Sequence, residues 1–279
     1  MLVLRRFLQD TSAVVGLAIV LFAVLVALFA EHLAPYPLDA YESHLLQRLQ
    51  PPSWEFPFGT DNLGRDIFSR VILGTQSALI VALSVVAASI LIGVPAGLFA
   101  GYFGGWLAEA IMRLTDVFLA VPQLILALAL AQLMSPSLET AMIALTLSYW
   151  PFFARSVYAE TQRLKVSVFV EALQGLGAGN LRVMFLHVLP NAASPIIVRA
   201  TIGMGFTILT AAVLGFLGMG ATPPEPDWGL AIAESRQYLP EAWWFATFPG
   251  LAIFAAVFGF NLLGDGVRDI VDPRLRRSR

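Results

Sequence analysis

Long runs of apolar residues dominate this chain of 279 residues, and they limit the folds that it can adopt. A bilayer core about 30 Å thick needs roughly 20 apolar residues of helix to cross it. Only 13% of the residues are charged, whereas soluble domains contain about 25%. We therefore predict an all-α membrane protein with six transmembrane helices. The predicted spans are Ala13–Ala30, Ser77–Ala100, Val117–Met134, Glu139–Ala154, Ile196–Gly220 and Ala242–Gly264.

The first apolar run could also be a cleaved signal peptide, because Arg5 and Arg6 precede it and small residues follow at Ala27 and Ala30. Its 18 uncharged residues exceed the usual apolar region of a signal, and further spans follow it. We interpret it as a retained helix.

Lys and Arg are distributed unevenly among the segments between the spans. Thirteen of the 17 fall on the side that holds the N-terminus, and four fall on the other side. Because these residues concentrate on the cytoplasmic side of a membrane, we predict that both termini are cytoplasmic.

This orientation gives the expected organisation of the chain. The predicted parts are a cytoplasmic N-terminus at 1–12, the first helix at 13–30, an extracytoplasmic loop at 31–76 and a five-helix core at 77–279, with a cytoplasmic loop at 155–195 and a cytoplasmic tail from residue 265.

The predicted spans contain almost no ionisable residue away from their ends, where Glu139 and Arg199 lie. A carrier driven by protons or sodium ions normally needs such a group at depth. The chain also lacks the G-x-x-x-x-G-K-[ST], G-x-S-x-G and H-E-x-x-H patterns, has no cysteine and has three scattered histidines. We therefore expect neither an enzyme nor a metal site, and a partner must power any uphill transport.

Three glycines lie on one face of the second predicted span. Gly93, Gly97 and Gly101 recur at every fourth residue, a spacing that lets another helix approach closely. The approaching helix can belong to the same subunit or to a sister subunit, and the spacing does not decide between them.

The central stretch EALQGLGAGNLRVMFLHVLPN, residues 171–191, predicts two short helices joined by a turn. The first should end at Gly175 or Gly177, because glycine readily adopts the left-handed cap conformation. Asn180 is the expected N-cap of the second helix, Leu181–Val188, and Pro190 is expected to end it.

An apolar stripe runs along the second of these helices and comprises Leu181, Met184, Phe185 and Val188. A helix of barely two turns is marginal alone in water, so the stripe must lie against something. The protein's own helices, the bilayer surface and a groove in a cytoplasmic partner are all compatible with the pattern.

The same stretch resembles the EAA signature of ATP-binding cassette importer permeases. Glu171, Ala172, Gly177, Leu189 and Pro190 match that signature, whereas Leu173 replaces its third-position alanine. His187 and Asn191 are similar to the dipeptide, oligopeptide and nickel branch, which commonly reads H-I-L-P-N. Four further blocks resemble this branch: FGTDNLGRDIFSR, GYFGGW, GFLGMGATPPEPDWG and FNLLGDGVRDIVDPRLRR.

The resemblance implies a type I importer permease fold in the bacterial cytoplasmic (inner) membrane. It implies a permease subunit that forms half of a translocation path, most simply for di- or oligopeptides. The implied partners are a second homologous permease subunit, two cytoplasmic ATPase subunits, an extracytoplasmic solute-binding protein and membrane lipid, with no nucleic acid. ATP and Mg are expected in the ATPases, and no cofactor or metal is expected in this chain.

The resemblance also assigns roles within the central stretch. Leu181–Val188 corresponds to a coupling helix seated in an ATPase groove, Gly177 permits the sharp turn, and Glu171 anchors the loop. The implied ATPase-coupling residues are Glu171, Ala172, Gly177, Leu181, Arg182, Met184, Phe185, His187, Leu189 and Pro190.

Two other charged stretches have two interpretations each. In the FGTDNLGRDIFSR block we expect a helix that Thr60 or Asp61 caps and that runs through Arg70, either as a structural lead into the second span or as a docking platform for the binding protein. The possible docking residues are Gly59, Thr60, Asp61, Arg65 and Asp66.

After the last span, four charged residues form either an ordinary charged helix end or an ATPase contact. They are Asp265, Arg268, Asp269 and Asp272.

Other functions are compatible with parts of these observations. A nickel or metal-chelate importer would share the same motifs. A secondary carrier or channel conflicts with the uncharged spans and with the EAA block, and a scaffold or sensor without transport is a third class. Co-purification with ATPases and ATP-dependent uptake would separate them.

Overall fold

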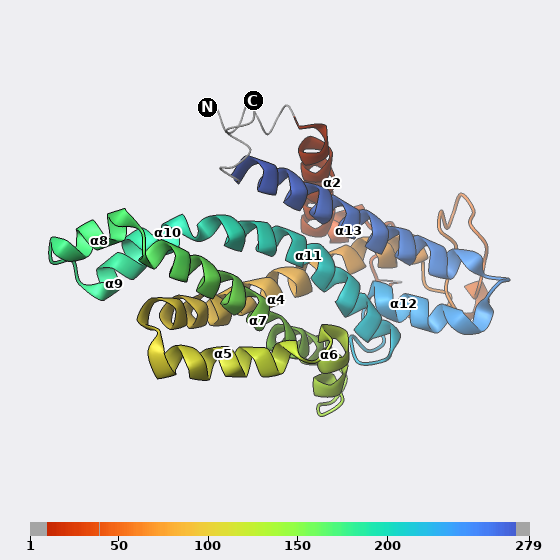
Figure 1. Cartoon of the computed structure of the whole chain (residues 1–279). Coiled ribbons are helices and arrows are strands. Elements are labelled where there is room, and N and C mark those ends of the chain that lie inside the picture. Colours follow the sequence, from red (N-terminus) through yellow and green to blue (C-terminus); the bar gives the residue numbers. More distant parts are fainter. Residues whose placement is uncertain (1–9, 39, 272–279) are drawn as a thin grey trace.

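The computed structural model describes residues 10–38 and 40–271, which form helices and a single isolated β-bridge, between Thr60 and Asp66. Figure 1 shows an elongated bundle with α8 and α9 at one end and α12 at the other. The described residues do not include Arg5, Arg6 and Asp272, which the sequence analysis placed near the two termini.

The longer helices are α2 (Thr11–Leu28), α4 (Ile67–Phe103), α5 (Gly105–Leu119), α6 (Gln123–Ala131), α7 (Leu138–Lys165), α11 (Ala193–Phe216) and α13 (Trp243–Val271). The shorter ones are α3 (Ala30–Leu33), η1 (Leu45–Gln47), α8 (Val168–Gly175), α9 (Asn180–Val183), η2 (Met184–Val188), α10 (Leu189–Asn191), α12 (Trp228–Ser235) and η3 (Arg236–Tyr238).

The all-helical membrane fold is confirmed. Within the described part of the chain, α2, α4, α11 and α13 are long and apolar enough to cross a membrane, and α5 with α6 forms a bent pair that can serve as a fifth crossing. The predicted fourth span lies inside α7, whose second half carries charged residues such as Arg155 and Glu160. The count of six spans therefore stays a prediction.

Three helices are longer than the predicted spans. α4 begins at Ile67 rather than Ser77, so the loop expected at 31–76 ends ten residues earlier. α7 continues past Ala154 to Lys165, and α13 continues through Val271, so the tail expected from residue 265 is helical up to that point. The added segments are more polar than the spans but contain no proline, and most polar residues are compatible with a helix.

The predicted third span, Val117–Met134, was wrong as a single helix. α5 ends at Leu119 and α6 begins at Gln123, and their axes differ by 87°. Pro122 has no N–H to donate, and its ring disfavours the helical conformation at Val121, so the helix breaks there. The segment that we expected to link two spans is therefore the first limb of a bent pair.

Gly93, Gly97 and Gly101 pack against α7 of the same chain, which decides between the two alternatives that the spacing left open. A Cβ atom added at Gly93 would lie 2.8 Å from Cβ of Phe153, and one added at Gly101 would lie 2.7 Å from Cβ of Thr161. Because residue numbers rise together along this contact, α4 and α7 run parallel.

α2 packs against α13 in the opposite sense. Gly266 lies against Ala13, and Gly259 lies against Ile19. Residue numbers therefore rise on one helix as they fall on the other, and the two helices are antiparallel. The start of α2 and the end of α13 lie on the same side of the bundle.

The contact between α4 and α7 predicts a position-specific effect of alanine. Gly97→Ala should lower the free energy of unfolding by about 1–3 kcal/mol, because the new Cβ would meet the backbone of Ala154. Gly250→Ala in α13 is the control, since nothing lies within 4 Å of its added Cβ, and it should be neutral or stabilising by roughly 0.5–1 kcal/mol. Thermal unfolding in detergent measures both, and equal midpoints would contradict the packing.

Candidate functional site

The central stretch forms a helical arm, residues 168–191, at one end of the bundle (Figure 1). Its first helix, α8, ends in a turn in which the N–H of Ala178 donates to the carbonyl of Leu173 at 3.0 Å. The N–H of Gly177 donates to the carbonyl of Gln174 at 2.9 Å, and Gly177 has φ of +82°. Gly177, and not Gly175, is therefore the left-handed residue that reverses the chain.

Tyr102, near the end of α4, joins the two helices of the arm. Its hydroxyl donates to Oδ1 of Asn180 at 3.2 Å and accepts from Nε2 of Gln174 at 3.1 Å. The ring is buried, and Nζ of Lys165 lies 5.8 Å from its centroid. No local pattern in the sequence indicated this role, because the three partners of Tyr102 are more than 60 residues away along the chain.

The second helix of the arm differs from the prediction at both ends. Gly179 is the N-cap, and Asn180 is already helical. Pro190 does not end the helix, because the preceding turn widens into the π-helical segment η2, where the N–H of Leu189 donates to the carbonyl of Met184. We infer that widening makes room for the proline ring, which in a regular α-helix would clash with the carbonyl four residues earlier.

The apolar stripe of this helix divides between two environments. Met184 and Val188 are buried, and with Val183 they join a core cluster that contains Leu98 of α4. Leu181 is 59% exposed and Phe185 is 43% exposed. Of the three surfaces that the pattern left open, the protein's own helices therefore cover one part of the stripe, and the other part is exposed.

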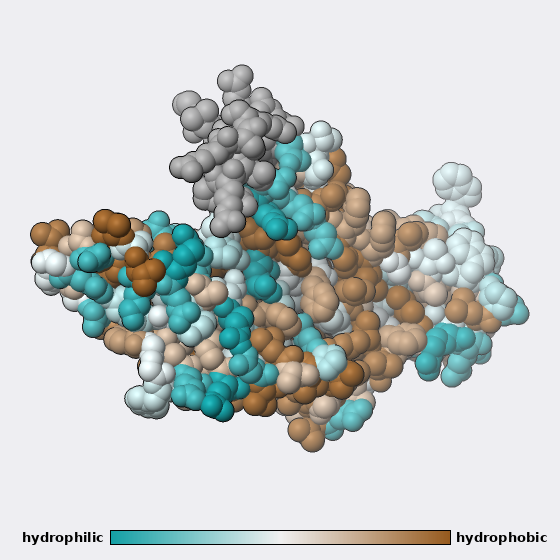
Figure 2. Space-filling model, in the orientation of Figure 1, coloured by the Kyte–Doolittle hydropathy of each residue, from teal (hydrophilic) through white to brown (hydrophobic). Residues whose placement is uncertain are grey.

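The remaining predicted coupling residues lie mainly on the surface of the arm. Glu171, Ala172, Arg182 and Pro190 are exposed, whereas His187 and Leu189 are half-buried. Leu176 and Leu186, which the motif does not include, are also exposed. In Figure 2 the arm accordingly shows separate hydrophobic side chains among hydrophilic ones.

At the opposite end of the bundle, the segment before α4 is not the helix that we expected. α4 begins at Ile67, and its N-cap is Asp66, whose Oδ2 accepts from the N–H of Ser69 at 2.8 Å. Thr60 instead accepts from the N–H of Gln50 through its hydroxyl, at 2.8 Å. Gly59 and Gly64 have positive φ, so a helix cannot run through this segment.

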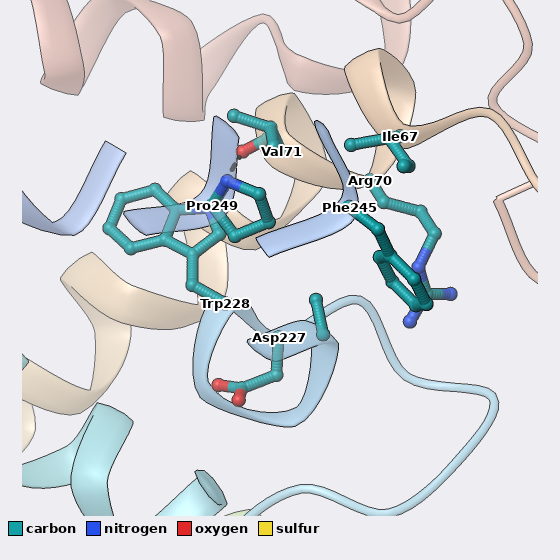
Figure 3. Close-up of a pocket in the computed structure, with 8 residues that line it drawn as sticks. Ile67, Arg70, Val71, Asp227, Trp228, Phe245 and Pro249 are labelled. Carbon is teal, nitrogen blue, oxygen red and sulfur yellow. Dashed lines mark hydrogen bonds between the residues drawn. The ribbon is translucent and has the colours of Figure 1, made fainter. Parts of the chain in front are cut away.

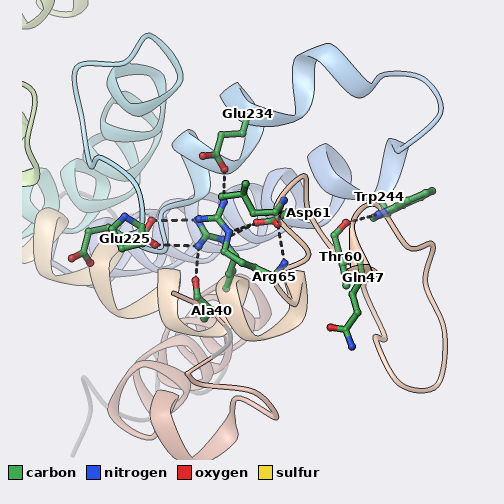
Figure 4. Close-up of polar contacts among 11 residues, drawn as sticks. Ala40, Gln47, Thr60, Asp61, Arg65, Glu225, Glu234 and Trp244 are labelled. Carbon is green, nitrogen blue, oxygen red and sulfur yellow. Dashed lines mark hydrogen bonds and ion pairs between the residues drawn. The ribbon is translucent and has the colours of Figure 1, made fainter. Parts of the chain in front are cut away.

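A buried ionic network occupies the same segment (Figure 4). Oδ2 of Asp61 lies 2.6 Å from Nε of Arg65, and Oδ1 of Asp61 accepts from the N–H groups of Leu63 and Arg65 at 2.8 and 2.9 Å. Nη2 of Arg65 donates to Oε2 of Glu234 in α12 at 2.9 Å. Burial raises the pKa of the Glu234 carboxyl, and the positive charge of Arg65 opposes that rise.

Arg70 extends this network to the loop that precedes α12. Its Nη1 donates to the carbonyls of Ala40 and Pro224 at 2.6 and 3.2 Å, and its Nη2 donates to the carbonyl of Glu225 at 3.3 Å. Arg70 therefore ties the start of α4 to two loops that are distant in sequence.

A cavity of only about 10 Å³ lies between Arg70 and α12 (Figure 3). Trp228 borders it and donates from Nε1 to the carbonyl of Val71 at 3.0 Å. Asp227 borders it too, and burial raises the pKa of its carboxyl. This space is no larger than a single water site, so it is not a solute pocket.

The candidate docking residues therefore lie in the interior of this chain. Thr60, Asp61, Arg65 and Asp66 are all buried, as is Gly59. Buried side chains cannot form the surface that a partner touches, so the geometry favours the structural role. Among the described residues, no group of three or more His, Asp or Glu side chains could hold a metal ion.

Comparison with known proteins places these features in a family. Residues 93–277 match the model of the binding-protein-dependent transport system inner membrane component, and residues 1–52 match the N-terminal TM domain of oligopeptide transport permease C. The chain is 43% identical to the dipeptide transport system permease protein DppC of Alkalihalophilus pseudofirmus, over 98% of this chain and 89% of that protein. It is 41% identical to the di/tripeptide transport system permease protein DppC of Pseudomonas aeruginosa, over 98% and 92%.

A solved structure shares the fold. An inward-facing conformation of the MetNI methionine ABC transporter superposes with a TM-score of 0.57 at 21% identity, covering 74% of this chain and 98% of the matched chain.

The turn of the arm predicts different effects for two nearby glycines. Gly177→Ala should destabilise the arm by about 1–2 kcal/mol, because a Cβ atom is strained at positive φ. Gly175→Ala is the matched control, since Gly175 ends α8 and has nothing within 4 Å of its added Cβ. Hydrogen exchange of the arm should rise only in Gly177→Ala, and equal exchange in both variants would contradict the turn.

The ionic network predicts a large cost for removing one partner. Arg65 is 1% exposed, so Arg65→Met should lower the free energy of unfolding by about 3–5 kcal/mol, because the carboxylates of Asp61 and Glu234 lose the guanidinium group that contacts both. Arg48→Met, an exposed arginine of the same segment, should change it by less than about 1 kcal/mol. Thermal unfolding in detergent tests this, and a small effect of Arg65→Met would contradict the network.

Proposed function

The chain belongs to the family of binding-protein-dependent transport system inner membrane components, and from that premise we propose that it imports di- or oligopeptides. As a member it is a permease subunit of an ATP-binding cassette importer, and the family is not itself catalytic. The relatives named above transport dipeptides or tripeptides, which supports a peptide solute. They do not favour the nickel alternative.

ATPase and binding-protein partners follow from the family. We propose that two ATPase subunits hydrolyse ATP with Mg, that a second permease subunit completes the path, and that this chain binds no cofactor. In this arrangement the arm and both termini are cytoplasmic, and the segment before α4 faces the binding protein.

The observation that carries the proposal is the divided stripe of the arm. Leu181 and Phe185 are exposed beside Leu176, and exposed apolar side chains on a short helix suit insertion into a groove of a partner. Their neighbours Met184 and Val188 are fixed in the core. One helix thus has a face for the ATPase and a face for the membrane domain.

The buried half of the stripe can transmit movement of the arm to the spans. Met184 and Val188 belong to the same packed cluster as Leu98 of α4, and Tyr102 of α4 holds both helices of the arm. A packed core transmits displacement because it has few voids in which to absorb it. Closure of the ATPases would therefore move the arm and α4 together.

At the other end, we propose that exposed side chains close to the ionic network meet the binding protein. Leu46 and Trp54 precede the network in the chain and are fully exposed, whereas the side chains of the network are buried. The network then acts as the support that fixes these loops on α4.

The coupling proposal is tested by Leu181→Asp combined with Phe185→Asp. These exposed positions should tolerate a charge without unfolding, but a charge in an apolar groove is costly, so retention of the ATPases should fall at least about tenfold. Leu133→Asp, at an exposed position between α6 and α7, is the control and should retain the ATPases. Co-purification of the whole transporter with tagged ATPase measures retention, and full retention by the double variant would sink the proposal.

Uptake tests the solute class directly. The assembled wild-type transporter in proteoliposomes, with its binding protein and ATP, should accumulate a labelled dipeptide. Accumulation of nickel but not of dipeptide would favour the nickel importer instead. Uptake that requires an ion gradient would favour a secondary carrier.

A further inference from the structure

α5 has three faces of different chemistry. Ala108, Met112 and Thr115 are buried against the bundle. Trp106, Leu114 and Val117 form an exposed apolar face. Glu109, Arg113 and Asp116 are also exposed and lie between these two faces, since residues three or four apart share one side of a helix.

The charged face lies inside the membrane if α5 and α6 together form one crossing. α5 is the first limb of the bent pair, and Asp116 lies 11 residues after Gly105, or about 16 Å along the helix. In such a crossing Asp116 lies at depth, although the sequence placed it between two predicted spans. A charged side chain there is costly toward lipid.

The neighbouring helices add charges on the same side. Arg155 of α7 forms an ion pair with Asp116. Arg199 of α11 lies over the ring of Phe152, which precedes Arg155 by one turn, with its Cζ 5.7 Å from the ring centroid. Figure 2 shows hydrophilic side chains in a band over α5 and α7 and toward α11, beside hydrophobic surface.

Both members of the pair keep surface free for a ligand. The side chain of Asp116 is 59% exposed and that of Arg155 is 42% exposed. A peptide carries an ammonium group at one end and a carboxylate at the other, which are the complements of these two side chains.

We propose that Asp116 and Arg155 line the cytoplasmic half of the solute path and bind the ammonium and carboxylate groups of a passing peptide. This inference rests on the proposed peptide-import function. It assigns α5 two exposed faces, an apolar one toward lipid and a charged one toward a water-filled path. The backbone break after Leu119 lies at the deeper end of this face, where irregular backbone is tolerated because it borders water or protein.

The absence of cysteine from the chain permits a direct test. Asp116→Cys and Val117→Cys place single thiols on adjacent residues, and Val117 is 66% exposed on the apolar face. The whole transporter, with cysteine-free partners, is reconstituted and treated from the cytoplasmic side with a charged methanethiosulfonate reagent. The thiol of the Asp116→Cys variant should react at least about tenfold faster than that of the Val117→Cys variant, because the reagent is excluded from hydrocarbon.

The solute provides the decisive arm of the experiment. An excess of dipeptide should slow the reaction of the Asp116→Cys variant severalfold. Absence of reaction in this variant would show that another subunit or lipid headgroups cover the charged face. If dipeptide did not slow the reaction, residue 116 would face water but would not contact the solute. Either result overturns the inference.

Transport kinetics give a second measurement that does not depend on cysteine. Asp116→Asn and Arg155→Gln should each lower kcat/KM for dipeptide uptake about tenfold, mainly through KM, while Val117→Ala stays near wild type. An unchanged KM in both charge variants would contradict solute binding. Wild-type uptake is the reference. If the wild type does not take up dipeptide, the peptide assignment fails. If the wild type takes it up and both charge variants keep the wild-type KM, only this inference fails.

Discussion

The close parallel contact between α4 and α7 is the interaction on which the rest of the structure depends. Gly93, Gly97 and Gly101 bring the two backbones together along about two turns of helix. In a membrane, helix association relies on such packing because lipid is as apolar as the side chains. This contact fixes the later part of α4 on α7, and both candidate sites are built on the ends of α4.

The two ends of α4 serve these sites by different chemistry. At one end Tyr102 makes two side-chain hydrogen bonds that hold both helices of the arm. At the other end Arg70, together with Asp61 and Arg65 just before the helix, forms a buried ionic network that holds the loops. Because α4 contacts both sites, a displacement at one of its ends can reach the other.

The sequence predicted the fold class and the arm because both depend on local patterns. Apolar length predicts spans, and glycine after a short helix predicts a turn, as Gly177 shows. The prediction of a helix before Ile67 failed. Asp61 and Arg65 look like helix-cap and surface residues in the sequence, and their buried role depends on Glu234, which is 169 residues from Arg65 in the chain. The third span failed as a single helix because hydropathy does not register that Pro122 breaks it.

The sequence by itself determined that the chain is a helical membrane protein, where most spans lie, and that the central stretch is two helices joined at a glycine. Each of these follows from properties of neighbouring residues. Only the tertiary structure decided that the glycine face packs within the subunit, that Met184 and Val188 are internal while Leu181 and Phe185 are exposed, and that Asp116 meets Arg155. Those outcomes depend on which helices lie side by side, and distant segments set that arrangement through packing.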